Sequence, residues 1–309
     1  MLRQVLLTMS RNPQVRDVLV AAPMTGDVVR RFVAGEGAED AIRVTRELTG
    51  AGLAITIDHL GEDVLDDQQA RATAESYSVL LNGLAEAGLA QGADVSVKLS
   101  AVGQALGSDG ESISYENALM ICDAAAAVGA SVTIDMEDHT TTDLTLNTVR
   151  RLRERHPNLG TVLQSYLYRT EEDVRSLAYA GSRIRLCKGA YKEPETVAYQ
   201  RKIDVDLSYV RCLRLLLESE AYPMFATHDP RLIKLGKSVA QRLGRGQDTF
   251  EFQMLHGIRP DEQLNLAGEG YRTRIYLPYG QDWYGYFMRR LAERPANLAF
   301  FARSLITKD

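Results

Sequence analysis

Apolar runs recur along the chain at a nearly constant spacing, and a segment with helical periodicity follows each of them. The runs start roughly 31 residues apart, which is close to the length of one strand–helix unit. The clearest helical patterns cover residues 67–90 and 196–220. We interpret eight runs as strands: residues 53–60, 95–100, 132–137, 161–167, 183–188, 223–228, 249–256 and 272–277.

This alternation predicts an α/β protein with a (β/α)8 barrel of the TIM type over residues 51–309. Residues 1–50 look helical throughout and would add an N-terminal helical segment to the same structural domain. No low-complexity linker, charge block or change of composition marks a second domain. A doubly wound open sheet is the structural alternative.

Polar residues alternate with apolar ones in the predicted strands 95–100 and 132–137, whereas buried parallel strands usually read as continuous apolar runs. Barrel enzymes place their chemistry at the carboxyl ends of the strands, so this pattern favours a binding site there. A salt-bridged barrel interior could account for part of it. In residues 183–188, alternation puts Arg185 and Lys188 on opposite faces, unless the strand ends or bulges near Cys187.

Composition places the chain among ordinary soluble proteins, with 45% hydrophobic and 25% charged residues. A net charge of −5 and the lack of a basic stripe argue against nucleic acid as a partner. Three widely spaced cysteines indicate no disulfide framework, which favours a reducing compartment. No apolar run reaches the ~20 residues that span a bilayer. The basic residues 1–16 fit a first amphipathic helix better than a mitochondrial targeting segment.

Near the end of the chain, Tyr286, Arg289, Arg290 and Glu293 stand at helical spacing on one face of a predicted helix. Two adjacent guanidiniums beside a tyrosine could bind a small carboxylate. A solvated helix face with Glu293 paired to an arginine is the alternative.

Cations also gather at the predicted strand ends, where the sequence places few carboxylates that would clearly face Lys98, Arg185 and Lys188. Such a cavity favours anions, and a phosphate-bearing cofactor beside a carboxylate substrate would account for the number of cations. The sequence contains neither GxGxxG nor a P-loop, so a nucleotide would be held in another way.

Two other chemistries are open at this stage. Lys98 or Lys188 could form a Schiff base if neighbouring cations lowered its pKa. A divalent metal could instead bind a set of acids and histidines, although these are dispersed and lack a tight ligand motif: Asp135, Glu137, His139, His228 and His256.

Short motifs along residues 53–300 together resemble the monofunctional FAD-dependent proline dehydrogenases, the proline oxidase family. Taken singly they are weak, but eight occur in the family's order. They are Leu60-Gly61-Glu62, Val97-Lys98-Leu99-Ser100, Ile134-Asp135-Met136-Glu137, Val162-Leu163-Gln164-Ser165-Tyr166-Leu167, Arg185-Leu186-Cys187-Lys188-Gly189-Ala190-Tyr191, Ala226-Thr227-His228-Asp229, Phe252-Gln253-Met254-Leu255-His256-Gly257 and Tyr276 with Tyr286-Phe287-Met288-Arg289-Arg290-Leu291. The resemblance implies a distorted barrel with FAD held noncovalently at the carboxyl ends of the strands.

The resemblance also implies residue roles. The carboxylate of L-proline would be bound by Lys98, Arg289 and Arg290. The walls of the ring pocket would be Leu255, Tyr276 and Tyr286. The flavin contacts would be Met136, Gln164, Arg185, Lys188, Gly189, Ala190, Thr227 and His228. Asp135 would orient Tyr276 or an arginine, and Glu62 would pair with Arg289 to close a lid. Lys192 departs from members that carry an aromatic residue there, which leaves the adenosine side of the pocket open.

The implied reaction is oxidation of L-proline to Δ1-pyrroline-5-carboxylate by hydride transfer to FAD, the first step of proline catabolism to glutamate. A quinone would take the electrons, so we expect a cytoplasmic protein that can touch the inner membrane peripherally. Residues 1–20 or the apolar tail (Leu298, Phe300, Phe301, Leu305) could make that contact, and packing against the barrel is the alternative for the tail. A pyrroline-5-carboxylate dehydrogenase would be a metabolic neighbour. A lyase or hydrolase on the same barrel, and a non-catalytic flavin or anion binder, are the rival functions.

Overall fold

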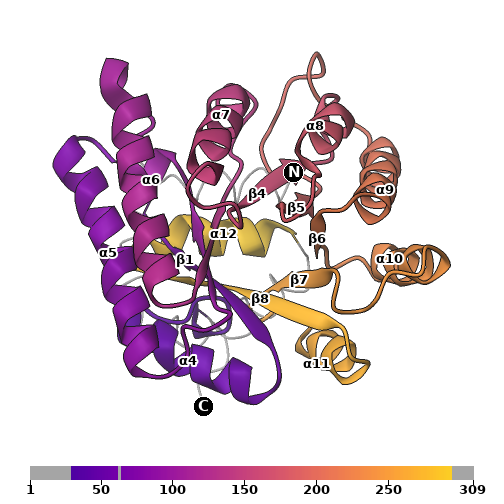
Figure 1. Ribbon diagram of the computed structural model, residues 1–309, viewed down its shortest axis with the longest axis horizontal. Helices are drawn as coiled ribbons and strands as arrows, with labels where there is room; N and C mark the ends of the chain where they lie inside the picture. The colour runs from indigo at the N-terminus through magenta and orange to yellow at the C-terminus, as the bar shows by residue number, and fades with distance from the viewer. Residues whose placement is uncertain (1–28, 62–63, 294–309) are drawn as a thin grey trace, which may run out of the picture.

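Eight parallel strands form a closed barrel in chain order in the computed structural model, which describes residues 29–61 and 64–293 (Figure 1). Strand β1 pairs with β8, so the sheet closes without a free edge. The barrel prediction is therefore confirmed and the open sheet is wrong. The strands are β1 Ala54–His59, β2 Asp94–Val97, β3 Ser131–Ile134, β4 Gly160–Gln164, β5 Arg183–Cys187, β6 Tyr222–Ala226, β7 Glu251–Leu255 and β8 Arg272–Tyr279.

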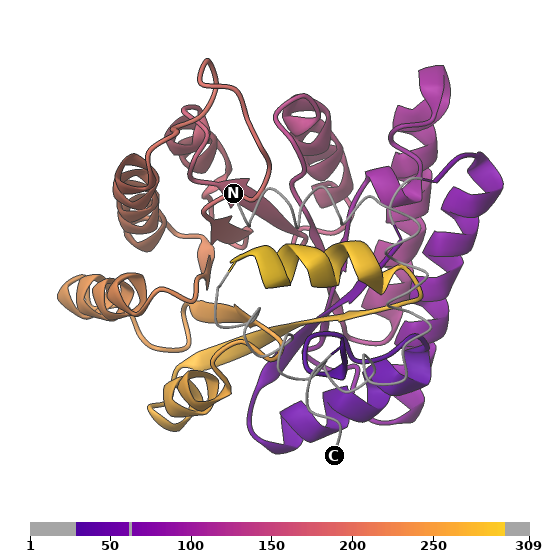
Figure 2. The same ribbon diagram turned by 180° about the vertical axis from the view of Figure 1, so that it is seen from behind.

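The helices other than the last one surround the barrel on its outer side (Figures 1 and 2). In α5, for example, the apolar residues at helical spacing are buried against the strands, as the sequence pattern predicts; Tyr77, Leu80 and Leu84 are at most 1% exposed. The helices are α4 Ala38–Gly50, α5 Asp67–Glu86, α6 Gly110–Ala127, α7 Thr142–Arg153, α8 Thr170–Leu177, α9 Lys202–Glu218, α10 Pro230–Arg242, α11 Pro260–Gly268 and α12 Trp283–Glu293, with short 3-10 turns at Ser100–Val102 and Gly107–Asp109.

Strand ends differ from the sequence prediction. β2 ends at Val97 and β3 ends at Ile134, each three residues before the predicted end. Beyond β2 the chain turns at once into a 3-10 segment that closes at Gly103, whose φ is +112°. The predicted ends are wrong because the pattern of apolar residues does not indicate where hydrogen bonding between neighbouring strands stops. The polar residues after these strands therefore lie in the loops at the carboxyl end of the barrel.

The first described segment departs from the expected continuous helix, because residues 31–37 are not helical. Ala34 donates its backbone N–H to the carbonyl of Pro278 at 2.9 Å, and Gly280 donates to the carbonyl of Gly35 at 3.0 Å. These bonds replace helical ones and attach the segment to the end of β8. Residues 1–28 and 294–309, which include the proposed membrane-contact segments, lie outside the described residues.

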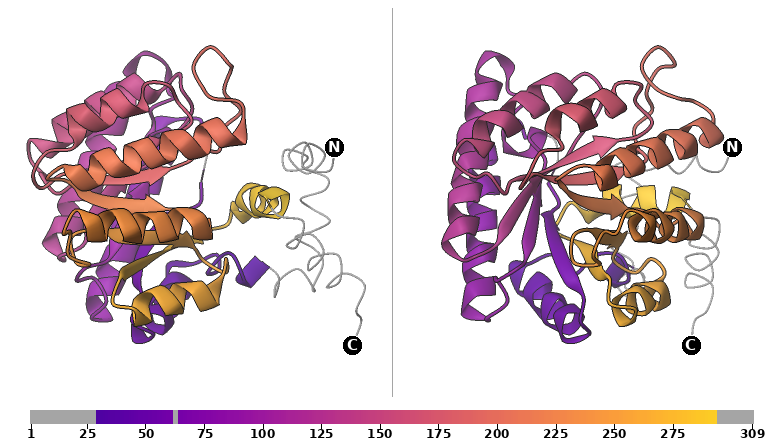
Figure 3. Two further views of the ribbon diagram at one scale, coloured as in Figure 1. Left: turned by 90° about the vertical axis from the view of Figure 1, so that its right-hand side faces the viewer. Right: turned by 45° about the vertical axis from the view of Figure 1, so that its right-hand side comes forward.

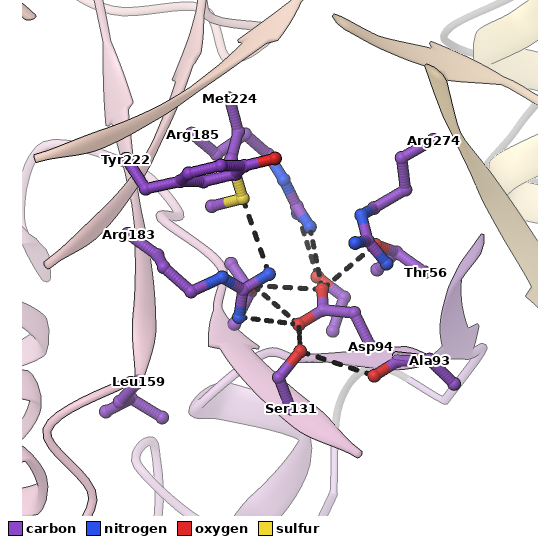
Figure 4. Close-up of polar contacts among 12 residues, drawn as sticks. Thr56, Ala93, Asp94, Ser131, Leu159, Arg183, Arg185, Tyr222, Met224 and Arg274 are labelled. Carbon is purple, nitrogen blue, oxygen red and sulfur yellow. Dashed lines mark hydrogen bonds and ion pairs between the residues drawn. The ribbon is translucent and has the colours of Figure 1, made fainter. Parts of the chain in front are cut away.

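Ion pairs fill the amino end of the barrel interior (Figure 4). Asp94, the first residue of β2, is fully buried among the guanidiniums of Arg183, Arg185 and Arg274. Its carboxylate lies 3.1 Å from Arg183 Nη1 and 3.5 Å from Arg185 Nη2. Burial would raise the pKa of Asp94, but the three arginine charges outweigh burial and hold that pKa well below its usual range. Part of the polar alternation in the strands therefore belongs to a salt-bridged interior.

Helix α12 lies across the opposite, carboxyl end of the barrel, as the side view in Figure 3 shows. It contributes Trp283, Tyr286 and Phe287 to an apolar cluster that also contains Phe32 and Leu60. The aromatic rings of Trp283 and Phe287 lie 6.0 Å apart in an edge-to-face contact. The last described helix thus covers the barrel end where the predicted site residues gather.

Candidate functional site

Asp135 is the centre of the polar site at the carboxyl end of the barrel. It follows β3 directly, and its Oδ1 accepts hydrogen bonds from Arg185 Nη1 at 2.7 Å and from Ser96 Oγ at 2.8 Å. Its Oδ2 accepts the hydroxyl of Tyr276 at 2.9 Å. Asp135 therefore contacts both of the partners that the sequence analysis named for it, and it joins side chains from β2, β5 and β8.

Tyr276 and Arg185 also contact each other, since the guanidinium carbon of Arg185 lies 5.4 Å from the centre of the Tyr276 ring. Burial raises the pKa of Tyr276 well above its usual value, and the charges of Asp135 and Asp58 raise it further. The hydroxyl therefore keeps its proton and acts as a donor to Asp135. The Tyr276 side chain is therefore held at its ring face by Arg185 and at its hydroxyl by Asp135.

Lys98 and Asp58 form a second ion pair at the same end, with Lys98 Nζ 3.0 Å from each carboxylate oxygen. The Asp58 side chain is 2% exposed and that of Lys98 is 14% exposed. Burial raises the pKa of Asp58, the charge of Lys98 opposes that rise, and the charge of Asp135 adds to it. The Asp58–Lys98 pair is therefore electrostatically coupled to Asp135.

The expectation that the cations face few carboxylates is wrong for the three strand-end cations. Lys98 pairs with Asp58 and Arg185 with Asp135. Lys188 lies 2.5 Å from Asp206 in α9 and 3.4 Å from Asp229, the N-cap residue of α10. The sequence analysis did not predict the partners of Lys188, because Asp206 belongs to a helix and Asp229 caps one, and an alternating strand pattern does not give the side-chain directions of such residues.

Arg185 and Lys188 do not come together, although β5 ends at Cys187, where the sequence analysis required it to end. Arg185 is buried inside the barrel, with 4% exposure, and contacts Asp135. Lys188 contacts carboxylates at the N-terminal parts of α9 and α10. The two cations would therefore serve different parts of a bound group.

Gly189 follows Lys188 with a φ of +109°, a conformation that disfavours other residues. A Cβ atom at this position would lie 2.4 Å from the ring of Tyr166, which packs directly on the glycine. Nearby, the Gln164 side-chain amide donates to the carbonyl of Glu137 at 2.7 Å. The carboxyl end of β4, which carries Gln164, and the loops after β3 and β5, which carry Met136 and Ala190, thus lie side by side.

The predicted pocket walls Tyr286 and Leu255 share one apolar cluster beneath α12. The guanidinium carbon of Arg290 lies 5.0 Å from the centre of the Tyr286 ring. His228, which follows β6, accepts the backbone N–H of Leu255 at its Nε2, at 2.9 Å, and so connects this wall to Thr227 beside it. Glu62 and the side chains of Arg289 and Glu293 lie outside the described residues, so the proposed lid pair remains a prediction.

The alternative metal ligands are not brought together. His139 pairs with Glu193, and His228 accepts the Leu255 N–H. Across residues 29–61 and 64–293, no group of three or more His, Cys, Asp or Glu side chains could hold a metal ion. The Schiff-base alternative required neighbouring cations, whereas Lys98 and Lys188 contact carboxylates.

Buried donors without acceptors mark where a further group would fit. Nε of Arg185 and Oγ of Ser165 are buried and make no hydrogen bond within the described structure, whereas Nη2 of Arg185 lies 3.5 Å from the Asp94 carboxylate. Unpaired buried donors cost free energy, which an acceptor-rich ligand would recover. A flavin has carbonyl and ring-nitrogen acceptors, so the donors of Arg185 within β5 and of Ser165 directly after β4 fit the cofactor that the resemblance implies.

Comparisons with known proteins agree with this geometry. A sequence model of the family described as Proline dehydrogenase matches residues 41–303. The chain is 44% identical over 308 residues to the Proline dehydrogenase of Deinococcus radiodurans, covering 98% of this chain and 97% of that protein. It is 40% identical over 308 residues to Proline dehydrogenase 1 of Bacillus subtilis strain 168, covering 100% of both chains.

Solved structures of larger proteins share the fold. The structure of proline utilization A (PutA) from Bdellovibrio bacteriovorus, inactivated by N-propargylglycine, superposes with a TM-score of 0.81 at 27% identity. The match covers 87% of this chain but only 33% of that one. PutA from Bradyrhizobium japonicum, at 24% identity and a TM-score of 0.71, supports the fold alone.

Proposed function

The chain belongs to the proline dehydrogenase family of oxidoreductases, and on this premise we propose that it oxidises L-proline to Δ1-pyrroline-5-carboxylate with noncovalently bound FAD. The observation that carries the proposal is the coupled pair of polar clusters under α12. Arg185, Asp135 and Tyr276 form one cluster, and Lys98 and Asp58 form the other. Family membership indicates the class of reaction. The polar contacts place cations and hydrogen-bond donors at the carboxyl end of the barrel, and the apolar residues of α12 cover that end.

Lys98, Arg290 and its sequence neighbour Arg289 would bind the carboxylate of L-proline. A cation–carboxylate contact in a partly buried site is stronger than a neutral hydrogen bond. Tyr276, Tyr286 and Leu255 would pack on the pyrrolidine ring, since Tyr286 and Leu255 share the apolar cluster under α12. Asp58 holds Lys98 in place before substrate arrives.

When bound, FAD supplies the hydride acceptor. Residues at the ends of β3 to β6 would hold it: Met136, Gln164, Arg185, Lys188, Gly189, Ala190, Thr227 and His228. Arg185 brings a fixed positive charge that would stabilise developing negative charge, and Asp135 fixes its direction. The amine of proline must be neutral to release hydride, and nearby cations favour loss of its proton.

A quinone would reoxidise the reduced FAD, and a pyrroline-5-carboxylate dehydrogenase would use the Δ1-pyrroline-5-carboxylate. Transfer to a membrane quinone would require peripheral contact with a bilayer. Within the described residues, no helix is both long and apolar enough to cross a membrane. The acceptor is therefore tested directly, by offering soluble and lipid-embedded quinones to the proline-treated protein.

The first experiment is a visible spectrum of the purified protein before and after L-proline is added without oxygen. We expect a flavin band that bleaches on addition of L-proline and stays unchanged with D-proline. A flavin that proline does not bleach would refute the substrate. A colourless protein that cannot be reconstituted with FAD would refute the cofactor and the proposed reaction together.

A further inference from the structure

A buried carboxylate lies in the loop that connects β5 to α9. The Glu193 side chain is 2% exposed, although its neighbours Lys192 and Pro194 are exposed. A buried carboxylate costs free energy unless hydrogen bonds satisfy it. The fold therefore maintains specific partners for Glu193.

These partners come from two other loops. Glu193 Oε1 accepts the backbone N–H of His139 at 2.9 Å and the hydroxyl of Tyr166 at 3.1 Å. Its Oε2 contacts the ring Nδ1 of His139. His139 lies in the loop after β3 and Tyr166 in the turn after β4. One carboxylate thus joins three consecutive loops at the carboxyl end of the barrel; we call these contacts the Glu193 bridge.

Tyr166 connects the Glu193 bridge to the segment 188–190. Its ring fills the space where a Cβ of Gly189 would lie, and its backbone N–H donates to the carbonyl of Lys188 at 2.9 Å. Burial, and then the charge of Glu193, raise the pKa of Tyr166, so its hydroxyl stays a donor. The position of Gly189 therefore depends on a ring that Glu193 holds at its far end.

The later part of the loop has its own contacts with the turn after β4, because Tyr168 donates its backbone N–H to Val197 at 3.0 Å and its hydroxyl to the carbonyl of Glu195 at 2.8 Å. From Lys188 to Arg201 the loop contains neither helix nor regular strand, and its one bridge pairs Ala198 with Leu167. Loops of this length without secondary structure are usually functional in compact domains. The Glu193 bridge gives this loop fixed contacts close to its amino end.

We propose that Glu193 is a positioning residue that fixes the segment 188–190 for cofactor binding by joining the loops after β3, β4 and β5. The proposal rests on the proposed function, because that function assigns this segment to the flavin. Glu193 would act through Tyr166 and the backbone, without touching the substrate.

The test uses the full chain loaded with FAD and compares Glu193→Ala and Tyr166→Phe with the control Glu195→Ala. Glu195 is exposed, lies two residues away in the same loop, and its side chain makes no contact of the Glu193 bridge. We measure amide hydrogen exchange of peptides covering 188–192 and the rate of FAD release into an excess of apo-glucose oxidase, which binds FAD. For Glu193→Ala we expect both rates to rise at least about tenfold, because three contacts with a buried charge are lost. Tyr166→Phe should show a smaller rise in both, and the control should match wild type.

Rates in Glu193→Ala within twofold of the Glu195→Ala control would overturn the proposal. If Glu193→Ala does not fold, Tyr166→Phe decides, since it removes a single hydroxyl; unchanged FAD release in that variant would overturn the proposal. A wild-type protein that takes up no FAD overturns the positioning role as well. If FAD binds and is released faster in the variants, but proline fails to reduce it, the proposed substrate fails while the role of Glu193 stands.

Discussion

Replacing Asp94 with alanine should strongly lower the free energy of unfolding at neutral pH. The substitution leaves the guanidiniums of Arg183, Arg185 and Arg274 facing one another inside the barrel (Figure 4). Arg183 and Arg185 have side chains only 14% and 5% exposed, so water cannot replace the lost carboxylate. Arg274 retains Glu251 at 2.7 Å.

The magnitude follows from these contacts. Removing one partner of a buried ion pair costs about 3–5 kcal/mol. The hydroxyls of Thr56, Ser131 and Thr133 also donate to Asp94 at 2.7–2.9 Å and lose their acceptor. Because these contacts share one group their costs do not add fully, and we expect roughly 4–6 kcal/mol in total. That is a large share of the stability of a typical domain, about 5–15 kcal/mol.

Urea unfolding at pH 7 measures this loss, with Ser131→Ala as the control. Ser131→Ala removes one hydrogen bond to the same carboxylate and should cost about 1 kcal/mol. Asp94→Asn keeps an acceptor for the hydroxyls but removes the charge, so its loss should lie between the two. An Asp94→Ala variant no less stable than Ser131→Ala would refute the reasoning.

The pH dependence gives a second check. The pKa of Asp94 is lowered in the folded protein, so its contribution is complete above the unfolded pKa of about 4 and is lost as the pH falls through the folded value. The stability difference between wild type and Asp94→Asn should therefore stay constant from about pH 7 to 5 and shrink below about pH 4. A difference that grows on acidification would contradict the assigned sign.

Three further predictions concern the site. Arg290→Ala should lower kcat/KM for L-proline by about 30- to 1000-fold, or about 2–4 kcal/mol, because a charged contact to the substrate is lost. An unchanged kcat/KM would exclude Arg290 from the carboxylate site. Tyr276→Phe removes the hydroxyl that donates to Asp135 and should lower kcat/KM about tenfold with little change in melting temperature; equal activity would show that the hydroxyl is dispensable. Lys98→Met should raise the pKa of Asp58 further, since the charge of Lys98 opposes the effect of burial. The acid limb of the plot of kcat/KM against pH should then move to higher pH. An acid limb that stays in place would show that Asp58 does not control activity.

The number, order and type of the barrel elements could be predicted from the sequence, because hydrophobic periodicity is a local property. Tyr77, Leu80 and Leu84 have the spacing of a buried helix face, and α5 buries all three. The strand ends were less accurate: β3 stops at Ile134, before the polar residues that the pattern had included. Apolar alternation reports burial and does not report the end of inter-strand pairing.

The pairing of charges was decided by the tertiary structure. Asp135 and Tyr276 are 141 residues apart in the chain, yet closure of the barrel brings them within 2.9 Å. The sequence pattern predicts few carboxylates around Lys188, because Asp206 in α9 and Asp229 at the start of α10 are placed beside it only by the packing of these helices on the barrel. Periodicity determines which face of an element a side chain occupies. The side chains that meet across the barrel depend on the register between strands and on helix packing, and these are set by long-range contacts that no local pattern encodes.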